Sequence, residues 1–284
     1  MALRLGKESK IALDSNRCVH TLHRLYDGDR QGGWVEDLDN IKNGSWVADE
    51  AEVYGDAVID NGSIVAGRAR VFDEAIVAGD AWGNAIIEGE AVVCEKGRVV
   101  CGRVDGYARV CGSALTFHGQ VSGNACIKDN AVVCGHGFIL SDGAVVSGNA
   151  YVCESIVAGN CQISGNAKVD RAYICGDAVI TEEAQVRGTI FFKSDLQVVN
   201  VVIKDAAVID GDACVGAISK EVVLNKGVVV GGNAHISSGD IIQDSIMGLP
   251  DTEREWNVAF SAAVDRIKDF YDCSGSISDP GLET

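Results

Sequence analysis

Proline is almost missing from this chain. The 284 residues include only Pro250 and Pro280, so the first 249 residues contain none. Proline cannot donate a backbone hydrogen bond to a strand ladder, and a long stretch without it favours continuous strand pairing. Aromatic residues are also scarce, at 6% of the chain against 47% for all hydrophobic residues. A core of this composition must be packed from Val, Ile and Ala rather than from large rings.

Basic residues are too few for an anionic partner. The chain has 24 Lys and Arg against 41 Asp and Glu, which gives a formal net charge of −17. Contacts with phosphates need clustered Lys and Arg, and so does attraction to an anionic lipid surface. We therefore expect no nucleic-acid partner and no membrane partner, and we interpret the acidity as a source of solubility.

Long apolar runs and disulfide spacings are missing as well. No stretch approaches the ~18 apolar residues of a membrane span. The opening residues MALRLGKESK lack the apolar segment of a signal peptide. The eleven cysteines are scattered without the framework of a small secreted domain. The expectation is a cytoplasmic protein with reduced thiols.

What the chain does contain is a repeat of six residues. Val or Ile recurs at this interval, and a small residue, mostly Ala, precedes most of them by two positions. The series includes Val53, Ile59, Val65, Val71, Val77, Ile87, Val93, Val99, Val121, Ile127, Val133, Ile139, Val157, Ile163, Val169, Ile174, Ile180, Val186, Phe192, Val198, Ile203, Ile209, Val215, Val230, Ile236 and Ile242.

A period of six excludes an amphipathic helix, whose period is 3.6, and a plain alternating strand, whose period is two. Gly-Asn and Gly-Asp pairs between the units supply residues that tolerate a positive φ. Each unit is thus predicted to be a short strand and a corner, and three units close one coil of a triangular prism. The span from Val53 to Ile242 has room for about ten coils of about 18 residues.

The repeat is not perfectly regular. It slips by one residue in places such as Val152 to Val157, which we attribute to a missing corner residue. Longer intervals from Val77 to Ile87, Val99 to Val121 and Val215 to Val230 are candidate loops. All are short, so we expect no long functional arms.

The two ends break the pattern, as an open solenoid needs caps over its exposed strand edges. Residues 1–45 are predicted to form an N-terminal cap, with a strand within Arg17–Asp27, and residues 46–248 to form the β-helix. Apolar residues at helical spacing after Pro250 predict a C-terminal helix over 249–273. Residues 274–284 are expected to be a flexible tail.

These repeats resemble the hexapeptide-repeat, left-handed β-helix proteins of the acyltransferase-like superfamily. The sequence GGWVE, followed by GNAxV and GDAxV repeats, is more narrowly similar to the YdcK-like group of bacterial and phage proteins. The resemblance implies an all-β, single-stranded, left-handed parallel β-helix that assembles as a homotrimer. It also implies active sites between subunits, although a fold does not by itself specify a reaction.

Enzymes of this superfamily use a histidine as general base, and His118, His136 and His235 lie within the predicted coils. His118 and His136 are separated by one predicted coil, and each precedes an inward aliphatic residue by three positions. They are predicted to stack at one corner, where they could bind a metal or keep one imidazole neutral as a base. The alternative is that histidine, like Asn, simply tolerates this turn position. We name His118 and His136 as candidate catalytic residues and assign no metal.

Other patterns favour structural roles. Cysteines directly follow inward residues, and we interpret them as small half-buried hydrophobes because they lack zinc-ligand spacing. The Gly-Asn corners lack the nonapeptide of calcium-binding repeats, and stacked Asn ladders explain them better. The resemblance implies that Lys193, Lys204, Lys220 and Lys226 near the C-terminal coils could bind CoA.

Two functions remain open at this point. The first is a rigid acidic scaffold that self-associates and binds a protein or small-molecule partner, with no cofactor. The second is an acyltransferase that uses acetyl-CoA or another acyl-CoA and a histidine general base.

Overall fold

The computed structural model describes most of the chain before residue 249. The predicted C-terminal helix and tail lie outside the described residues. The ranges described are 3–81, 83–135, 139–188, 190–193, 196–199, 201–203, 207–216, 222–224, 228–232, 234–236, 241–242 and 246–248.

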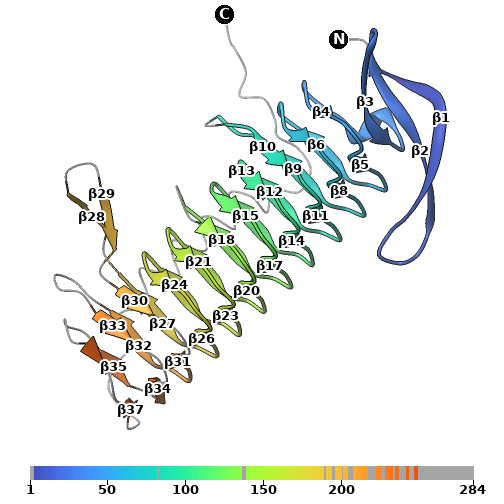
Figure 1. Cartoon of the computed structure of the whole chain (residues 1–284). Helices are drawn as coiled ribbons and strands as arrows, with labels where there is room; N and C mark the ends of the chain where they lie inside the picture. Colours follow the sequence, from blue (N-terminus) through green and yellow to red (C-terminus); the bar gives the residue numbers. More distant parts are fainter. Residues whose placement is uncertain are drawn as a thin grey trace, which may run out of the picture. The chain divides into compact units, whose positions relative to one another are not determined.

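Short parallel strands stack into a β-solenoid with three faces, each face being one sheet (Figure 1). The first face has 14 strands, of which β1 and β2 belong to the N-terminal segment. Its strands are β1 (Leu3–Leu13), β2 (Val19–Asp27), β3 (Arg30–Val35), β5 (Glu52–Val53), β8 (Arg70–Val71), β11 (Val92–Val93), β14 (Arg109–Val110), β17 (Cys126–Ile127), β20 (Val145–Val146), β23 (Gln162–Ile163), β26 (Val179–Ile180), β31 (Val208–Ile209), β34 (Val229–Gly232) and β37 (Ile246–Gly248).

The second face has 11 strands and the third has 10. The second comprises β4 (Trp46–Val47), β7 (Ile64–Val65), β10 (Ala85–Ile87), β13 (Gly102–Val104), β16 (Gln120–Val121), β19 (Ile139–Leu140), β22 (Ile156–Val157), β25 (Tyr173–Ile174), β30 (Val201–Ile203), β33 (Val222–Leu224) and β36 (Ile241–Ile242). The third comprises β6 (Val58–Asp60), β9 (Ile76–Ala78), β12 (Arg98–Val100), β15 (Leu115–Phe117), β18 (Val132–Cys134), β21 (Tyr151–Cys153), β24 (Lys168–Asp170), β27 (Gln185–Arg187), β32 (Cys214–Gly216) and β35 (His235–Ile236).

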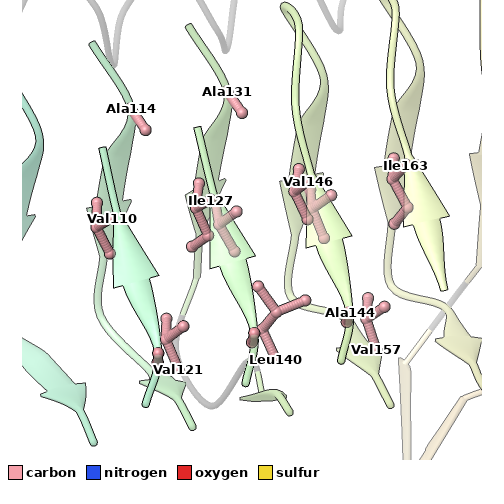
Figure 2. Packing of buried hydrophobic residues seen from close by; sticks show 14 of the residues in the cluster. Val110, Ala114, Val121, Ile127, Ala131, Leu140, Ala144, Val146, Val157 and Ile163 are labelled. Carbon is pink, nitrogen blue, oxygen red and sulfur yellow. The ribbon is translucent and has the colours of Figure 1, made fainter. Parts of the chain in front are cut away.

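The core is the column of inward residues that the repeat predicts. Among the described side chains, the Val or Ile that most strands point inward and the small residue two positions earlier are almost all 0–1% exposed, as at Val53 and Ala51. Figure 2 shows this packing for neighbouring coils, with residues such as Ile127 and Val146 side by side. The third face has ten successive strands, so the chain completes nine turns between β6 and β35, close to the expected ten coils.

The predicted coil length of about 18 residues holds in the first coils, where the Gly67 amide donates to Asp49 across 18 residues, but not further along the chain. Glu95 accepts the amide hydrogen of Gly112 at the same corner of the next coil, and these residues are 17 residues apart. The coil is one residue shorter at the corner that follows the third face. Thr116 and Val121 are successive inward residues there, and they are five positions apart instead of six. We call this the tight corner. It turns through a residue with positive φ, such as His118 or Arg171, and it explains the one-residue slips in the repeat.

Three details of the predicted register are wrong. Leu140, not Ile139, is in register with Val121 and 1% exposed. The interval from Val99 to Val121 is not a loop. Val99 to Thr116 is one complete coil, in which Val104 and Val110 are inward and Thr116 takes a position usually held by Val or Ile. Thr116 is 2% exposed, and its hydroxyl lies 3.5 Å from the Arg98 carbonyl oxygen.

The third correction concerns β28 (Ile190–Lys193) and β29 (Leu196–Val199). They pair with each other as an antiparallel hairpin in a separate two-stranded sheet. Phe192 and Val198 were predicted to continue the coils, but they belong to this hairpin, which is an arm between β27 and β30 (Figure 1). The expectation of no long arm is therefore wrong.

The other corners are held by side chains that reach the next coil. Asp129, with φ 62°, accepts the amide hydrogen of Gly148 through Oδ2 at 3.0 Å. Asp142 does the same for Gly159 at 3.1 Å. The predicted Asn ladder is confirmed, because the Asn130 amide donates to Asn149 at 3.1 Å and Asn149 donates to Asn166 at 2.9 Å.

The N-terminal segment continues the first face. Strands β1 and β2 are antiparallel, β2 and β3 are antiparallel, and β3 pairs in parallel with β5. The short 3-10 helix η1 (Leu38–Asn40) follows and is closed by a reciprocal cap between Asp37 and Asn40. The strand expected within Arg17–Asp27 is β2. Within the described ranges, no helix is long and apolar enough to cross a membrane.

Candidate functional site

Three chemically reactive side chains converge at the tight corner of adjacent coils. Cys101 directly follows β12, and His118 directly follows β15, which is the next strand on the third face. Their positions are equivalent, because the Cys101 amide donates to Ala78 and the His118 amide donates to Val100 in the same ladder. Both have a φ of 54°, so the backbone turns alike at each and their side chains stack.

Asp80 joins them from the coil before. This coil is longer than the others: the Glu95 amide donates to Asp73 at the same corner of the preceding coil, and the two are 22 residues apart. The extra residues fall in the interval from Val77 to Ile87, which was predicted to be a loop. The Asp80 amide donates to the Gly83 carbonyl oxygen at 2.8 Å, and the Gly83 amide lies 3.2 Å from Asp80 Oδ1. This small turn holds the Asp80 carboxylate over the tight corner.

The carboxylate contacts both neighbours. Its Oδ2 lies 3.0 Å from His118 Nε2, and its Oδ1 lies 2.8 Å from Cys101 Sγ. The sulfur is also 2.7 Å from the Gly83 carbonyl oxygen. Nitrogen, sulfur and oxygen donor atoms of Asp80, Cys101 and His118 all lie within 4.8 Å of one another. We call these three residues the corner cluster.

The cluster is largely shielded from solvent. Cys101 is 4% exposed, and the side chains of His118 and Asp80 are 11% and 19% exposed. The Phe117 ring meets the His118 ring edge to face, with centroids 4.1 Å apart. Burial, followed by the hydrogen bond to Asp80, raises the pKa of Cys101 to about 11. The thiol is therefore protonated at neutral pH and is not an activated nucleophile.

The register at the tight corner bears on the position of His118, one of the histidines singled out in the sequence. The residue equivalent to His118 in the next coil is Gly135, whose amide donates to Phe117. Gly135, and not His136, therefore occupies the position equivalent to His118, and His136 itself lies outside the described residues. His235 lies on β35, but its side chain is not among those described.

Sequence reasoning did not find the partners of His118. Cys101 and His118 are separated by one true coil, which is one residue shorter than the predicted coil, so the average period does not align them. Asp80 was hidden in an interval treated only as a loop. Of the four lysines, Lys193 is on β28 without a described side chain, and the other three lie outside the described residues.

A second polar cluster lies beside the N-terminal strands. His20 Nδ1 is 2.9 Å from Glu36 Oε2, and its Nε2 is 3.3 Å from Asp14 Oδ2. An acidic hollow here is also lined by Asp37 and Asp73. The contacts of His20 link β2 to the segment after β3, which indicates a structural role for this histidine.

Two cysteine pairs stack between neighbouring coils, one directly after β11 and β14 and the other on β18 and β21. Cys94 Sγ and Cys111 Sγ are 2.9 Å apart, and Cys134 is in register with Cys153. The pairing of Cys94 with Cys111 lowers the pKa of Cys111 to about 7, and the nearby Arg109 guanidinium adds to this.

Comparison with protein-family models and with curated proteins finds no match for this chain.

Proposed function

We propose that this protein is a rigid scaffold built on a left-handed hexapeptide-type β-helix, and that it self-associates to present repeated faces to a protein or small-molecule partner. The handedness, the YdcK-like grouping, a bacterial or phage origin and a trimeric state rest on the sequence resemblance. The cytoplasmic location rests on the composition. No cofactor is needed for this function.

The observation that carries the proposal is the open edge of β1. This 11-residue strand is terminal in its sheet, so its outer backbone groups face away from β2. Unpaired strand edges are templates for pairing with another chain. Beside this edge, Ile11, Leu13 and Val19 are 70%, 49% and 66% exposed. Leu13 and Val19 are register partners, so the three form one apolar patch, which we call the β1 patch.

A second copy of this chain is the occupant that we propose for the β1 patch. Backbone pairing would satisfy the edge of β1, and burial of three apolar side chains would add to it. Strand β1 carries Arg4, Lys7 and Lys10 against one acidic residue, Glu8, in a chain whose net charge is −17. Lys10 pairs with Glu52 of its own chain, so Arg4 and Lys7 are the basic residues that favour contact with acidic residues of another copy.

Light scattering of the purified protein tests this function. The expected mass is three times the 29.8 kDa of one chain. An Ile11→Lys, Val19→Lys double variant is expected to give a single chain. Tyr107→Lys is the matched control, because Tyr107 is 61% exposed on a coil away from β1. A single-chain mass for the unmodified protein would contradict the scaffold proposal, and an unchanged mass for the double variant would exclude the β1 patch.

The second candidate function is acyl transfer from an acyl-CoA. It is favoured by the 3.0 Å contact between His118 Nε2 and Asp80 Oδ2, since a carboxylate that orients an imidazole is a common arrangement for a general base. A thermal-shift titration with acetyl-CoA tests it, because a ligand of the native state raises the midpoint. No shift at millimolar acetyl-CoA would argue against this candidate.

A further inference from the structure

The geometry points to a metal site at the corner cluster, in which Asp80, Cys101 and His118 bind one zinc-class divalent ion. This inference is independent of the scaffold function. It competes with the general-base function of His118, because an imidazole nitrogen that ligates a metal cannot also accept a proton.

The donor set itself favours such an ion. One thiolate, one imidazole nitrogen and one carboxylate oxygen are the ligand types that Zn²⁺ takes in proteins. Mg²⁺ and Ca²⁺ select oxygen ligands, and a thiolate disfavours them. Thiolate and carboxylate together carry two negative charges, so a divalent cation would leave this shielded corner neutral. Neutrality matters here because an uncompensated charge is costly to bury.

The distances suit the size of the ion. Zinc–ligand bonds of about 2.0–2.3 Å place the donor atoms of a tetrahedral site about 3.3–3.8 Å apart. In the corner cluster, two donor pairs lie at 3.0 and 2.8 Å, and all three donors lie within 4.8 Å of one another. The two printed separations are shorter than the required value, so these donor atoms must move apart by less than about 1 Å when the ion binds.

The contacts of Cys101 give an independent reason. Its sulfur lies 2.8 Å from Asp80 Oδ1 and 2.7 Å from the Gly83 carbonyl oxygen. A thiol has one hydrogen and is a weak donor. It can satisfy only one of these oxygens, so the other oxygen faces a sulfur lone pair at close range. A cation bound between the sulfur and the Asp80 carboxylate removes the repulsion between these two groups, and the thiol proton leaves to solvent on binding. The sulfur must then move away from the Gly83 carbonyl oxygen, because a thiolate has no hydrogen to donate to it.

The fold explains why the three ligands meet although no short ligand motif exists. Cys101 and His118 occupy the same position of consecutive coils, and adjacent strands are about 4.8 Å apart. Asp80 reaches them because its coil carries the turn to Gly83. Three protein ligands leave a fourth position for water or a partner molecule, as in zinc sites that are not purely structural.

The test uses the full-length protein, stripped of metal by a chelator and titrated with Co²⁺ as a spectroscopic substitute for Zn²⁺. We expect one equivalent to bind, with a thiolate-to-cobalt charge-transfer band and the visible bands of a tetrahedral ion, and Zn²⁺ to displace it. Cys101→Gly is the informative variant, because Gly accepts the φ of 54° at this position. It should abolish the charge-transfer band and weaken binding at least ~100-fold, since even indirect partners of a metal are worth about 10–100-fold.

Three further variants control for folding and for other sites. His118→Asn should weaken binding similarly, and Asn also tolerates a positive φ, so circular dichroism should show an intact fold. Cys126→Ser removes a half-buried cysteine outside the cluster, and His20→Asn removes the histidine of the acidic hollow. Both should bind Co²⁺ as the unmodified protein does. Absence of a charge-transfer band in the unmodified protein, or equal binding by Cys101→Gly, would overturn the inference.

Discussion

His118 Nε2 and Asp80 Oδ2 lie 3.0 Å apart although two coils of chain separate them in the sequence. The first of these coils is lengthened by the turn from Asp80 to Gly83, and the second has the regular length. Residues far apart in a solenoid sequence meet only when their positions differ by whole coils. The contact therefore depends on the register of β9, β12 and β15, which pair in parallel.

The inward and outward positions of one strand should respond very differently to charge. On β7, Val65 is fully buried and its neighbour Ile64 is 37% exposed. Val65→Asp should cost more than ~3 kcal/mol of unfolding free energy, because an unpaired carboxylate would lie in a dry core. Ile64→Asp should cost less than ~1 kcal/mol, as surface substitutions usually do. Urea unfolding followed by circular dichroism measures both, and similar losses would show that the assigned register is wrong.

The acidic corner residues should contribute through both backbone and side chain. Asp129 has a φ of 62° and accepts the Gly148 amide hydrogen. Asp129→Ala should destabilise by ~2 kcal/mol, because alanine disfavours a positive φ and lacks the acceptor. Asp129→Asn keeps both features and should lose less than half as much. Thermal unfolding compares them, and an alanine variant as stable as the asparagine variant would contradict this account.

The N-terminal strands should become less stable as pH rises above the unfolded pKa of histidine, about 6.5. Burial alone would lower the pKa of His20, but hydrogen bonds to Glu36 and Asp14 outweigh it and raise this pKa. A raised pKa in the folded state gives stability that is complete below the unfolded pKa, about 6.5, and that is lost as pH rises through the folded value.

Hydrogen exchange of Val19–Asp27 between pH 5.5 and 8.5 measures this effect after correction for intrinsic rates. Protection should fall across the range in the unmodified protein. His20→Asn should remove the pH dependence, and His118→Asn should leave it intact. Protection that rises with pH would reverse the predicted sign.

The stacked thiols of Cys94 and Cys111 should differ in reactivity. The pKa of Cys111 is lowered to about 7, whereas the hydrogen bond to Cys111, followed by burial, raises the pKa of Cys94. Because the thiolate is the nucleophile, iodoacetamide at pH 7.5 should alkylate Cys111 first. Peptide mass spectrometry measures the order. Arg109→Gln should slow the reaction at Cys111, and faster alkylation of Cys94 would contradict the assignment.

The β28–β29 hairpin should be dispensable for the fold. It lengthens its coil: the Gly211 amide donates to Glu182 in the preceding coil, and these two are 29 residues apart, against 17 residues for Gly112 and Glu95. Deleting residues 189–200 removes this difference, so the circular dichroism spectrum should stay that of a β-protein and the thermal midpoint should change little. A deletion of equal length within one regular coil, 121–132, is the control and should prevent folding. Loss of folding in the first deletion would show that the hairpin is structural.

The sequence predicts the core better than the site. Inward residues such as Val53 and Ile163 are found by spacing alone, because each must fill the same narrow prism. Thr116 was not predicted to point inward, because its hydroxyl suggests a surface position although its shape matches that of Val. The sequence also did not predict that the members of the corner cluster meet. One long coil and one regular coil bring them together, and an average period of six residues does not give the lengths of these two coils. Long-range register, rather than residue preference, decides which polar side chains meet.

The stacked strands also fix distances along the axis of the solenoid. Each coil adds about 4.8 Å along the axis, so the nine turns between β6 and β35 fix a distance of about 43 Å. Extra residues at a corner, such as the Asp80 turn or the β28–β29 hairpin, add side chains at that corner and do not change that distance. Groups displayed at corners are therefore held at intervals set by the spacing of the backbone strands. Duplication of one coil would move every later group by about 4.8 Å along the axis.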